Sequence, residues 1–518
     1  MKNIKIIVLL LIGMSLSSCD KYLDAEVVSE ISAASFWKTT DDVEAYRYGC
    51  YDRFRDLNNS TFLAEDRGDS FKVGEIGPAS DAWSQALDKD HTINLTSYYN
   101  ALYHFNLLLQ QTPLINFGKN TNNRDKIMAE ALAMRAHTYL NLLKAFGDIP
   151  LILQPYEGSS TELIGRTPKE EVMAQVLADI DEAISLFKSD AIEDKNFWSK
   201  PALYALKADA LIWKAKVHGG GAIDLQLAVD AINSLEGITS LNLLDDYASV
   251  FSSSNKKNNE IIFSIRFDRD EQSGQYGSRT KSRTDQNSQA WNADLLSTTV
   301  DNTARHVYAP SDELEAIYQV NPDDTREGVS IIYPLVIVSQ IDVSANEFDG
   351  SQGDQIGVRD NGDIIVVTEW EKLTPLTDKY RGTFYSDVGN FNYDDDIIIY
   401  RNADLLLLRA EANAGLGNIG PATIDLNIVR NRAGIGNYTG PADKISLEKE
   451  ILDERFRELF LELKRWPDLV RAHFWGTIDI YQTVPTLRGK NTPLYFPISD
   501  SDWRENPLLK QTEGYNPF

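Results

Sequence analysis

Apolar residues recur at spacings of three and four along much of the first half of the chain. Between residues 168 and 187, Val172, Val176, Ile180 and Ile184 form one such stripe. This period places the apolar side chains on one face of an α-helix, as in a helix packed on a core. The same pattern predicts helices over residues 97–111, 125–146, 168–187, 200–218 and 224–235, and an earlier helix that begins after Thr39 or Thr40.

Small and large side chains alternate within several of these helices, most clearly over residues 202–210, where alanines separate larger residues. Small residues let neighbouring helices approach closely, as in the helical hairpins of tetratricopeptide repeats. A hairpin of similar size returns at residues 403–412 and 422–429, and one last long helix is predicted over residues 446–473. The sequence therefore predicts a mainly α fold, a scaffold of tetratricopeptide-like helical hairpins.

The pattern changes between residues 236 and 400. Short β-branched runs appear there, separated by loops rich in Gly, Ser, Asn and Asp, which is typical of strands joined by turns. The runs cover residues 260–267, 331–341, 363–370 and 396–400. We expect an irregular insert with a few short strands, and we place the ligand face there because binding residues often lie on loops that a rigid scaffold supports.

The N-terminus has the features of a secretory signal. Lys2 and Lys5 precede an apolar run at residues 6–16, which is too short to span a bilayer, and small residues follow. The segment Leu-Ser-Ser-Cys that ends at Cys19 resembles a bacterial lipobox, in which the cysteine becomes the acylated N-terminus. The alternative is ordinary cleavage near Ser18 with a free Cys19. With Cys19 acylated, the second cysteine, Cys50, has no partner, and we expect it to be buried.

Charge and composition narrow the possible ligands. The 518 residues carry a formal net charge of −26, and no basic run offsets it. Nucleic acid is excluded as a partner, because its binding depends on clustered Lys and Arg. The acidic excess favours neutral or cationic ligands.

Catalytic and cofactor motifs are mostly absent from the sequence. A GxGxxG match at residues 415–420 follows a helix instead of a strand, so we interpret its glycines as a helix cap and turn. The chain has no P-loop, HExxH, CxxC or GxSxG motif, and we expect no cofactor. Asp394, Asp395 and Asp396 are weak candidates for a calcium site, with a solvated turn as the favoured alternative.

Several segments together resemble the SusD/RagB family of Bacteroidetes outer-membrane lipoproteins. Residues 400–407 (YRNADLLL) with 410–412 (AEA) are similar to the family's "RYADVLL…AEA" segment, although Asn402 stands where tyrosine is usual. Residues 426–434 (LNIVRNRAG) and 454–471 (ERFREL to RWPDLVR) match two further motifs. Weaker matches, in family order, cover residues 19–24, 35–38, 135–140, 146–151, 495–498 and 506–515.

The resemblance implies a function as well as a fold. Members capture oligosaccharides, or in some cases peptides, at the outside of the outer membrane, and act as a lid over a SusC-like TonB-dependent transporter. It implies a binding protein that is not an enzyme. The matching motifs are structural, and their Arg and Glu residues are expected to form buried ion pairs within the helical stack.

Candidate ligand residues come from position and composition, because no family motif covers them. A sugar site needs flat aromatic rings beside polar groups. Trp83 follows a glycine-rich loop, and three polar residues nearby could assist it. The second group lies in the insert. The candidates are Trp83, Asp66, Arg67 and Asp69 in the first group, and Trp291 and Tyr276 in the second.

These observations divide the chain into a leader, a tether and the folded part. The predicted boundaries are 1–18 for the signal peptide, 19–35 for the lipidated tether, 36–235 for the first helical region, 236–400 for the insert and 401–518 for the C-terminal helical region. The leading hypothesis is a lipid-anchored glycan-binding protein. Peptide capture, a tetratricopeptide-type interaction scaffold and a surface hydrolase remain as alternatives.

Overall fold

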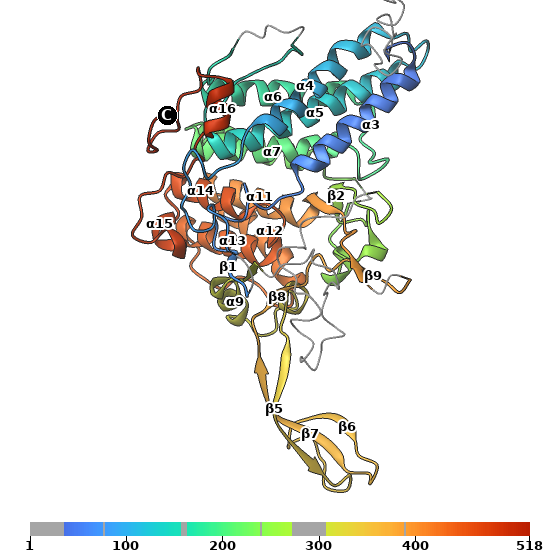
Figure 1. Ribbon diagram of the computed structural model, residues 1–518, viewed down its shortest axis with the longest axis vertical. Coiled ribbons are helices and arrows are strands. Elements are labelled where there is room, and N and C mark those ends of the chain that lie inside the picture. The colour runs from blue at the N-terminus through green and yellow to red at the C-terminus, as the bar shows by residue number, and fades with distance from the viewer. Residues whose placement is uncertain (1–35, 76–77, 157–162, 239–240, 272–306, 388–389) are drawn as a thin grey trace, which may run out of the picture.

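Consecutive helices pack side by side through the first half of the chain (Figure 1). The computed structural model describes residues 36–75, 78–156, 163–238, 241–271, 307–387 and 390–518. The helices of the first half are α3 (Thr40–Leu57), α4 (Thr96–Gln111), α5 (Thr121–Phe146), α6 (Lys169–Leu186), α7 (Lys200–Val217) and α8 (Gly221–Asn233). The mainly α, tetratricopeptide-like scaffold is therefore confirmed, and the predicted helix ends lie within a few residues of the observed ones.

Local sequence explains where several helices begin and end. Thr39 and Asp42 form a capping box at the start of α3, which satisfies backbone N–H groups that have no partner within the helix. Gly147 ends α5 with a φ of 72°. Gly417 ends helix α11 (Asn402–Leu416) in the left-handed conformation with a φ of 82°, which confirms the helix cap within the GxGxxG match. Gly415 lies inside α11 and Gly420 inside the helix that follows.

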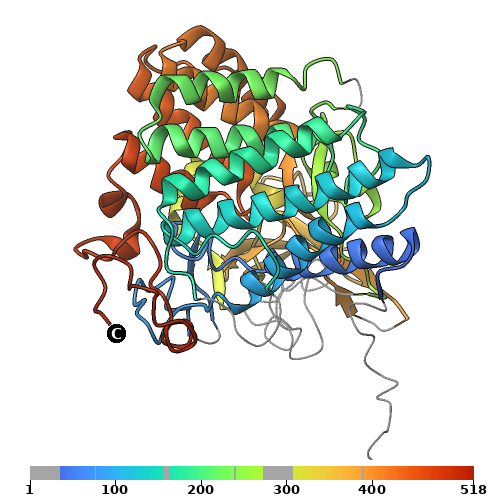
Figure 2. The ribbon, with the colours of Figure 1, turned by 90° about the horizontal axis from the view of Figure 1, so that it is seen from above.

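The stack continues across the insert into the C-terminal part. Helix α8 packs directly on α11, although they are far apart in sequence. Figure 2 shows the resulting curved array, which runs from the blue and green helices to the orange ones. The C-terminal helices after α11 are α12 (Ile419–Arg432), α13 (Lys444–Leu459), α14 (Arg465–Trp475), α15 (Ile480–Thr483) and α16 (Asp500–Glu505). Cys50 is 1% exposed, as expected, and Trp213 and Trp466 are equally buried in the core.

The prediction of one long helix over residues 446–473 is wrong. The helix is interrupted between α13 and α14, where Leu461 and Leu463 have φ values of 61° and 60°. Left-handed backbone is costly for leucine and requires support from the surrounding structure. That support includes Glu462 between them, which is buried and receives hydrogen bonds from Arg401 and Lys379.

The insert contains paired strands and short helices. Strand β2 (Ile261–Ile265) pairs antiparallel with β11 (Ile397–Arg401), so the first and last strands of the insert meet at its base. Further pairs are β4 (Ile331–Ile332) with β8 (Leu376–Thr377) and β9 (Thr383–Tyr385) with β10 (Asn390–Asn392), while β3 (Tyr308–Pro310) pairs outside the insert with β1 (Phe71–Val73). The insert also contains the helices α9 (Asp312–Gln319) and α10 (Glu327–Ser330).

Part of the insert forms an arm that projects from the helical body (Figure 1). The arm consists of β5 (Leu335–Val343), β6 (Asp354–Val358) and β7 (Ile364–Lys372), with β7 in the centre. Val338, Ile341 and Val358 are exposed on it. The sequence predicted strands over residues 331–341 and 363–370 but did not indicate that they extend away from the scaffold.

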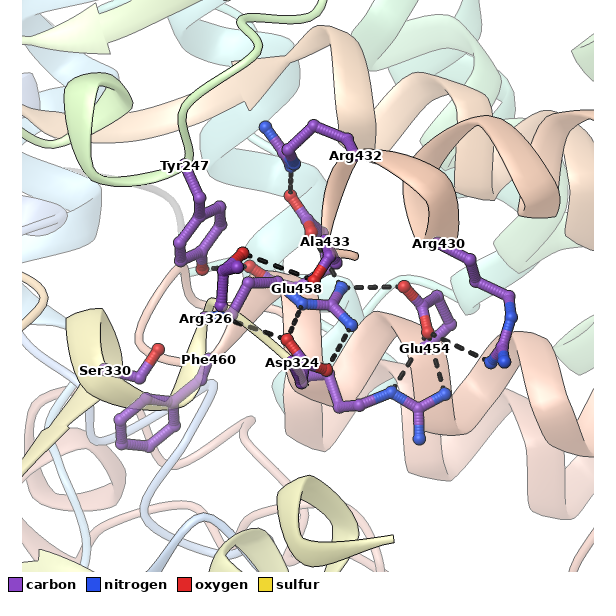
Figure 3. A network of polar contacts seen from close by, with 12 residues as sticks. Tyr247, Asp324, Arg326, Ser330, Arg430, Arg432, Ala433, Glu454, Glu458 and Phe460 are labelled. Atoms are coloured by element: carbon purple, nitrogen blue, oxygen red, sulfur yellow. Dashed lines mark hydrogen bonds and ion pairs between the residues drawn. The ribbon is translucent and has the colours of Figure 1, made fainter. Parts of the chain in front are cut away.

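Buried ion pairs join the insert to the C-terminal helices, as the motifs predicted. Arg401, at the end of β11, contacts Glu260, Glu458 and Glu462 at 2.6, 2.5 and 2.7 Å, and all four side chains are at most 1% exposed. Figure 3 shows the neighbouring part, in which Glu458 on α13 also pairs with Arg326 and Arg432. A buried charge is tolerated only when it is paired, so these contacts couple the parts of the fold.

Candidate functional site

The loop between α3 and α4 presents Trp83 in a fixed orientation. The indole Nε1 donates to the Phe71 carbonyl at 2.8 Å, and the Trp83 backbone N–H donates to Ser80 Oγ at 3.1 Å. The ring is half-buried against the core. A sugar-binding aromatic residue benefits from such fixation, because little rotamer entropy remains to be lost on binding.

Asp66 supports this loop from inside the protein. It has no exposed surface, and its carboxylate accepts hydrogen bonds from Thr61, Ser80 and Tyr308 at 2.6, 2.9 and 3.0 Å. Ser80 is also the residue that fixes the Trp83 backbone. Asp66 therefore has a structural role in this structure and lies behind the surface that Trp83 reaches.

Arg67 is also completely buried. Its guanidinium donates to the carbonyls of Pro493 and Leu494, both at 2.7 Å, and to Gln85 Oε1 at 3.0 Å. Gln85 has a φ of 57°, so Arg67 stabilises a strained turn two residues after Trp83. Burial lowers the pKa of Arg67 to about 10.

Asp69 anchors the same loop to the C-terminal half. Its two carboxylate oxygens accept hydrogen bonds from Arg465 at 2.6 and 2.7 Å, and both residues are at most 5% exposed. The buried side chains of Asp66, Arg67 and Asp69 therefore hold the loop of Trp83 from the protein interior. A ligand on the surface would not reach them without a rearrangement of the loop.

Three candidates lie outside the described residues: Trp291, Tyr276 and the lipidation candidate Cys19. The described residue that follows the segment of Trp291 is Val307, whose carbonyl accepts a hydrogen bond from Gly74 at 2.8 Å. Strand β3 then pairs with β1, and Tyr308 stacks on Phe71 with ring centroids 4.9 Å apart. The first described residues after this segment thus lie beside the loop of Trp83.

Asp394, Asp395 and Asp396 do not form a solvated turn, which corrects that expectation. They are 6%, 8% and 9% exposed. Their carboxylates accept hydrogen bonds from different partners: Asp394 from Tyr385, Asp395 from the Gly382 N–H, and Asp396 from Asn196. No group of three or more His, Cys, Asp or Glu side chains suited to a metal ion occurs within the described ranges.

Glu65 gives the loop a dependence on pH. It is fully buried and accepts hydrogen bonds from Ser70 Oγ at 2.7 Å and the Lys464 N–H at 3.3 Å. Burial raises its pKa to about 7. Because the folded-state pKa lies above the unfolded value, ionisation of Glu65 opposes folding as pH rises towards 7.

We expect Glu65→Gln to raise the free energy of unfolding by about 1–3 kcal/mol at pH 8 and to have little effect at pH 5. Thermal melts of the two proteins across this range measure the difference. The exposed Glu347→Gln is the control and should behave like the wild type. An equal effect of Glu65→Gln at both pH values would contradict the assignment.

A deep cleft, which the sequence did not predict, lies at the junction of the two helical regions. Its volume is about 440 Å³. Helices α5 and α7 form one side, and α11, α13 and α14 form the other, while residues 56–64 and 92–98 border it. The side chains that line the cleft come from segments far apart in sequence. The one sequence feature that could have indicated the cleft is the group of polar residues within the helix at residues 125–146.

Comparisons with known proteins agree with this architecture. The family model described as "SusD family" matches residues 259–515. A second model, described as "Starch-binding associating with outer membrane", matches residues 21–210. The two models cover most of both halves of the chain. Among the described residues, no helix is both long and apolar enough to cross a membrane.

Two individual proteins are similar over nearly the whole length, and a third is similar over a shorter segment. A SusD-like protein of Formosa agariphila is 27% identical over 544 residues, with 99% of each chain covered. The structure of NanU from Bacteroides fragilis has a TM-score of 0.78 and 26% identity, with 95% of this chain and 100% of that chain covered. The starch-binding protein SusD of Bacteroides thetaiotaomicron is 36% identical over 127 residues, which is 24% of this chain and 22% of that one. The chain therefore belongs to the SusD/RagB family.

Proposed function

We propose that this protein is a cell-surface lipoprotein that binds oligosaccharides and delivers them to a SusC-like TonB-dependent transporter in the outer membrane. In this proposal Cys19 carries the lipid anchor and the folded part faces the cell exterior. The protein binds its ligand without chemical conversion. Capture of peptides by the same fold is the alternative.

Family relatives support the choice of a glycan. One matching family model is described as starch-binding, and the relative from B. thetaiotaomicron is named a starch-binding protein. The net charge of −26 also suits a neutral ligand better than an acidic one. The family model associated with the outer membrane supports the location.

The observation that carries the proposal is the fixed, half-buried Trp83. Aromatic rings bind the C–H faces of sugars, and a ring held by its own Nε1 hydrogen bond offers that face at low entropic cost. Trp291 and Tyr276 are the further proposed ligand residues. Val307, the first described residue after them in the chain, lies beside the loop of Trp83.

We expect Trp83→Ala to weaken oligosaccharide binding by at least about tenfold, or about 1.4 kcal/mol, without a change in the folded state. A soluble form that begins after Cys19 is tested by affinity electrophoresis and calorimetry against panels of polysaccharides and peptides. Trp503→Ala is the matched control, because this half-buried Trp lies on α16, where it stacks on Phe518, and not in the loop of Trp83.

The panels also separate the alternatives. If the protein is retained by one class of glycan and that glycan is recovered intact, the result supports the proposal. Degradation of the glycan would identify a hydrolase. Binding to peptides alone would assign the protein to the peptide-capturing members. Equal glycan binding by Trp83→Ala and the wild type would remove Trp83 from the site.

A further inference from the structure

We infer that the cleft between the two helical regions is a second binding site, one that takes a short neutral saccharide of one or two sugar units. The inference rests on the proposed function, because it assumes that sugars reach this protein. The cleft volume of about 440 Å³ lies in the range of small-molecule sites.

The mouth of the cleft is polar and open to solvent. Ser60, Asn94 and Ser97 line it and are exposed. The walls behind them carry the half-buried rings of Phe62 and Tyr98. Hydroxyl and amide groups beside aromatic rings are the groups that contact the hydroxyls and the apolar faces of a sugar.

The floor of the cleft is charged but balanced. It holds the cations Lys144, Lys464, Arg455 and Arg471 and the anions Asp209, Asp404, Glu462 and Asp468, and the exposed Asp56 also lines the cleft. Each anion of the floor pairs with a cation: Asp209 with Lys144, Asp404 with Lys464 and Arg455, Asp468 with Arg455 and Arg471, and Glu462 with Lys379 and Arg401. A charged ligand gains little from such a balanced floor and loses its hydration on entry, so the cleft favours a neutral ligand.

Hydrogen-bond capacity remains for such a ligand. Lys144 Nζ donates to both oxygens of Asp209, at 2.8 and 2.7 Å, and Lys464 Nζ contacts Ile399 O at 2.8 Å and Asp404 Oδ2 at 3.1 Å. An ammonium group has three N–H donors, so each lysine has one more than these contacts use. The ammonium groups also lie near aromatic rings, Lys144 at 5.8 Å from Trp213 and Lys464 at 4.3 Å from Tyr400, and a ligand hydroxyl would compete with these weaker contacts.

His137 adds a neutral donor or acceptor to the same floor. It is 5% exposed, and its Nδ1 lies 3.4 Å from Asn141 Nδ2. Burial, together with Lys144 and Lys464, lowers its pKa to about 3. The imidazole is therefore uncharged at neutral pH and can contact a hydroxyl without the cost of burying another charge.

The cleft is separate from the surface of Trp83. Trp83 does not line it. The two sites share one structural link, because the Arg67 guanidinium that supports the turn after Trp83 lies 4.4 Å from the ring of Trp466, and Trp466 lines the cleft. Because Trp83 does not line the cleft, binding of a long glycan at the surface and binding of a short saccharide in the cleft can be tested independently.

The test measures binding of D-glucose, D-galactose, N-acetyl-D-glucosamine, maltose and cellobiose by calorimetry and saturation-transfer NMR, with glucuronate and dipeptides as charged probes. We expect at least one neutral probe to bind the wild type. Ser97→Trp, which blocks the exposed mouth, should weaken that binding at least tenfold. Asn100→Trp, exposed on the same helix but outside the cleft lining, should leave it unchanged. In Trp83→Ala, which alters the surface site, the short probe should still bind in the cleft, because Trp83 does not line it.

Each other result overturns the inference. Absence of neutral-probe binding up to about 10 mM, which corresponds to less than about 3 kcal/mol of affinity, would leave the cleft without this role. Loss of short-saccharide binding in Trp83→Ala would show a single surface site, and preference for charged probes or dipeptides would contradict the balanced floor. Polysaccharide retention by the wild type reports separately on the proposed function.

Discussion

Glu458→Gln is expected to lower the free energy of unfolding by about 3–5 kcal/mol, because it leaves several buried arginines without their shared partner. The Glu458 carboxylate contacts Arg326 at 2.9 Å and Arg401 at 2.5 Å, and it also pairs with Arg432. These arginines come from the insert, from β11 and from α12. The loss should therefore destabilise the connection between the insert and the C-terminal helices.

Thermal and chemical denaturation measure the effect, and Glu193→Gln is the matched control. Glu193 pairs with Lys126 at 2.6 Å but is 70% exposed on its side chain, so its replacement should cost less than about 1 kcal/mol. The arginines hold the pKa of Glu458 well below its ordinary value. The difference in the free energy of unfolding between the wild type and Glu458→Gln should thus be largest at pH 7 and shrink as pH falls below about 4. If Glu458→Gln were as stable as the wild type at pH 7, Glu458 would not be the residue that stabilises this connection.

Asp69→Asn should cost about 3 kcal/mol of stability, while the folded protein keeps its affinity for ligand to within a few fold. The asparagine removes the charge that compensates Arg465, which donates to Asp69 at 2.6 and 2.7 Å within the core. Arg465 would then remain buried, with its guanidinium 3.8 Å from the ring of Phe456.

This variant separates a supporting residue from a ligand contact. The melting temperature and the glycan dissociation constant are measured on the same sample, at a temperature where the variant is folded. Unchanged stability together with a large loss of affinity would show that Asp69 contacts the ligand directly. Asp81→Asn, an exposed residue of the loop that carries Trp83, is the control and should change the stability little.

The helices could be predicted because their signals are local. Apolar spacing, the cap residues at Thr39 and Ser199 and the terminal glycines all lie within a few residues of the element they specify. The break between α13 and α14 has no such signal, since leucine does not favour a left-handed backbone. Contacts of Glu462 with the distant Arg401 and Lys379 help to keep that conformation.

The candidate site was only partly predictable for a related reason. Trp83 was chosen because it is an aromatic residue in polar, irregular surroundings after a glycine-rich loop, and its part in binding stays a prediction. Asp66, Arg67 and Asp69 looked like surface residues because their partners are remote: Tyr308, the carbonyls of residues 493 and 494, and Arg465. The cleft combines side chains from several helices, so only the folded chain shows it.

The arm formed by β5, β6 and β7 enters and leaves the body at one point. The Leu373 N–H donates to the Pro334 carbonyl at 2.9 Å, so the residue before β5 and the residue after β7 are paired where the arm meets the scaffold. The turn at residues 359–363 lies at the opposite end, beyond the paired residues Val343 and Ile364. A fluorophore or a second protein domain grafted into this turn would thus stand clear of the helices, the loop of Trp83 and the cleft. The turn offers an attachment point from which the distance to a membrane or transporter can be measured.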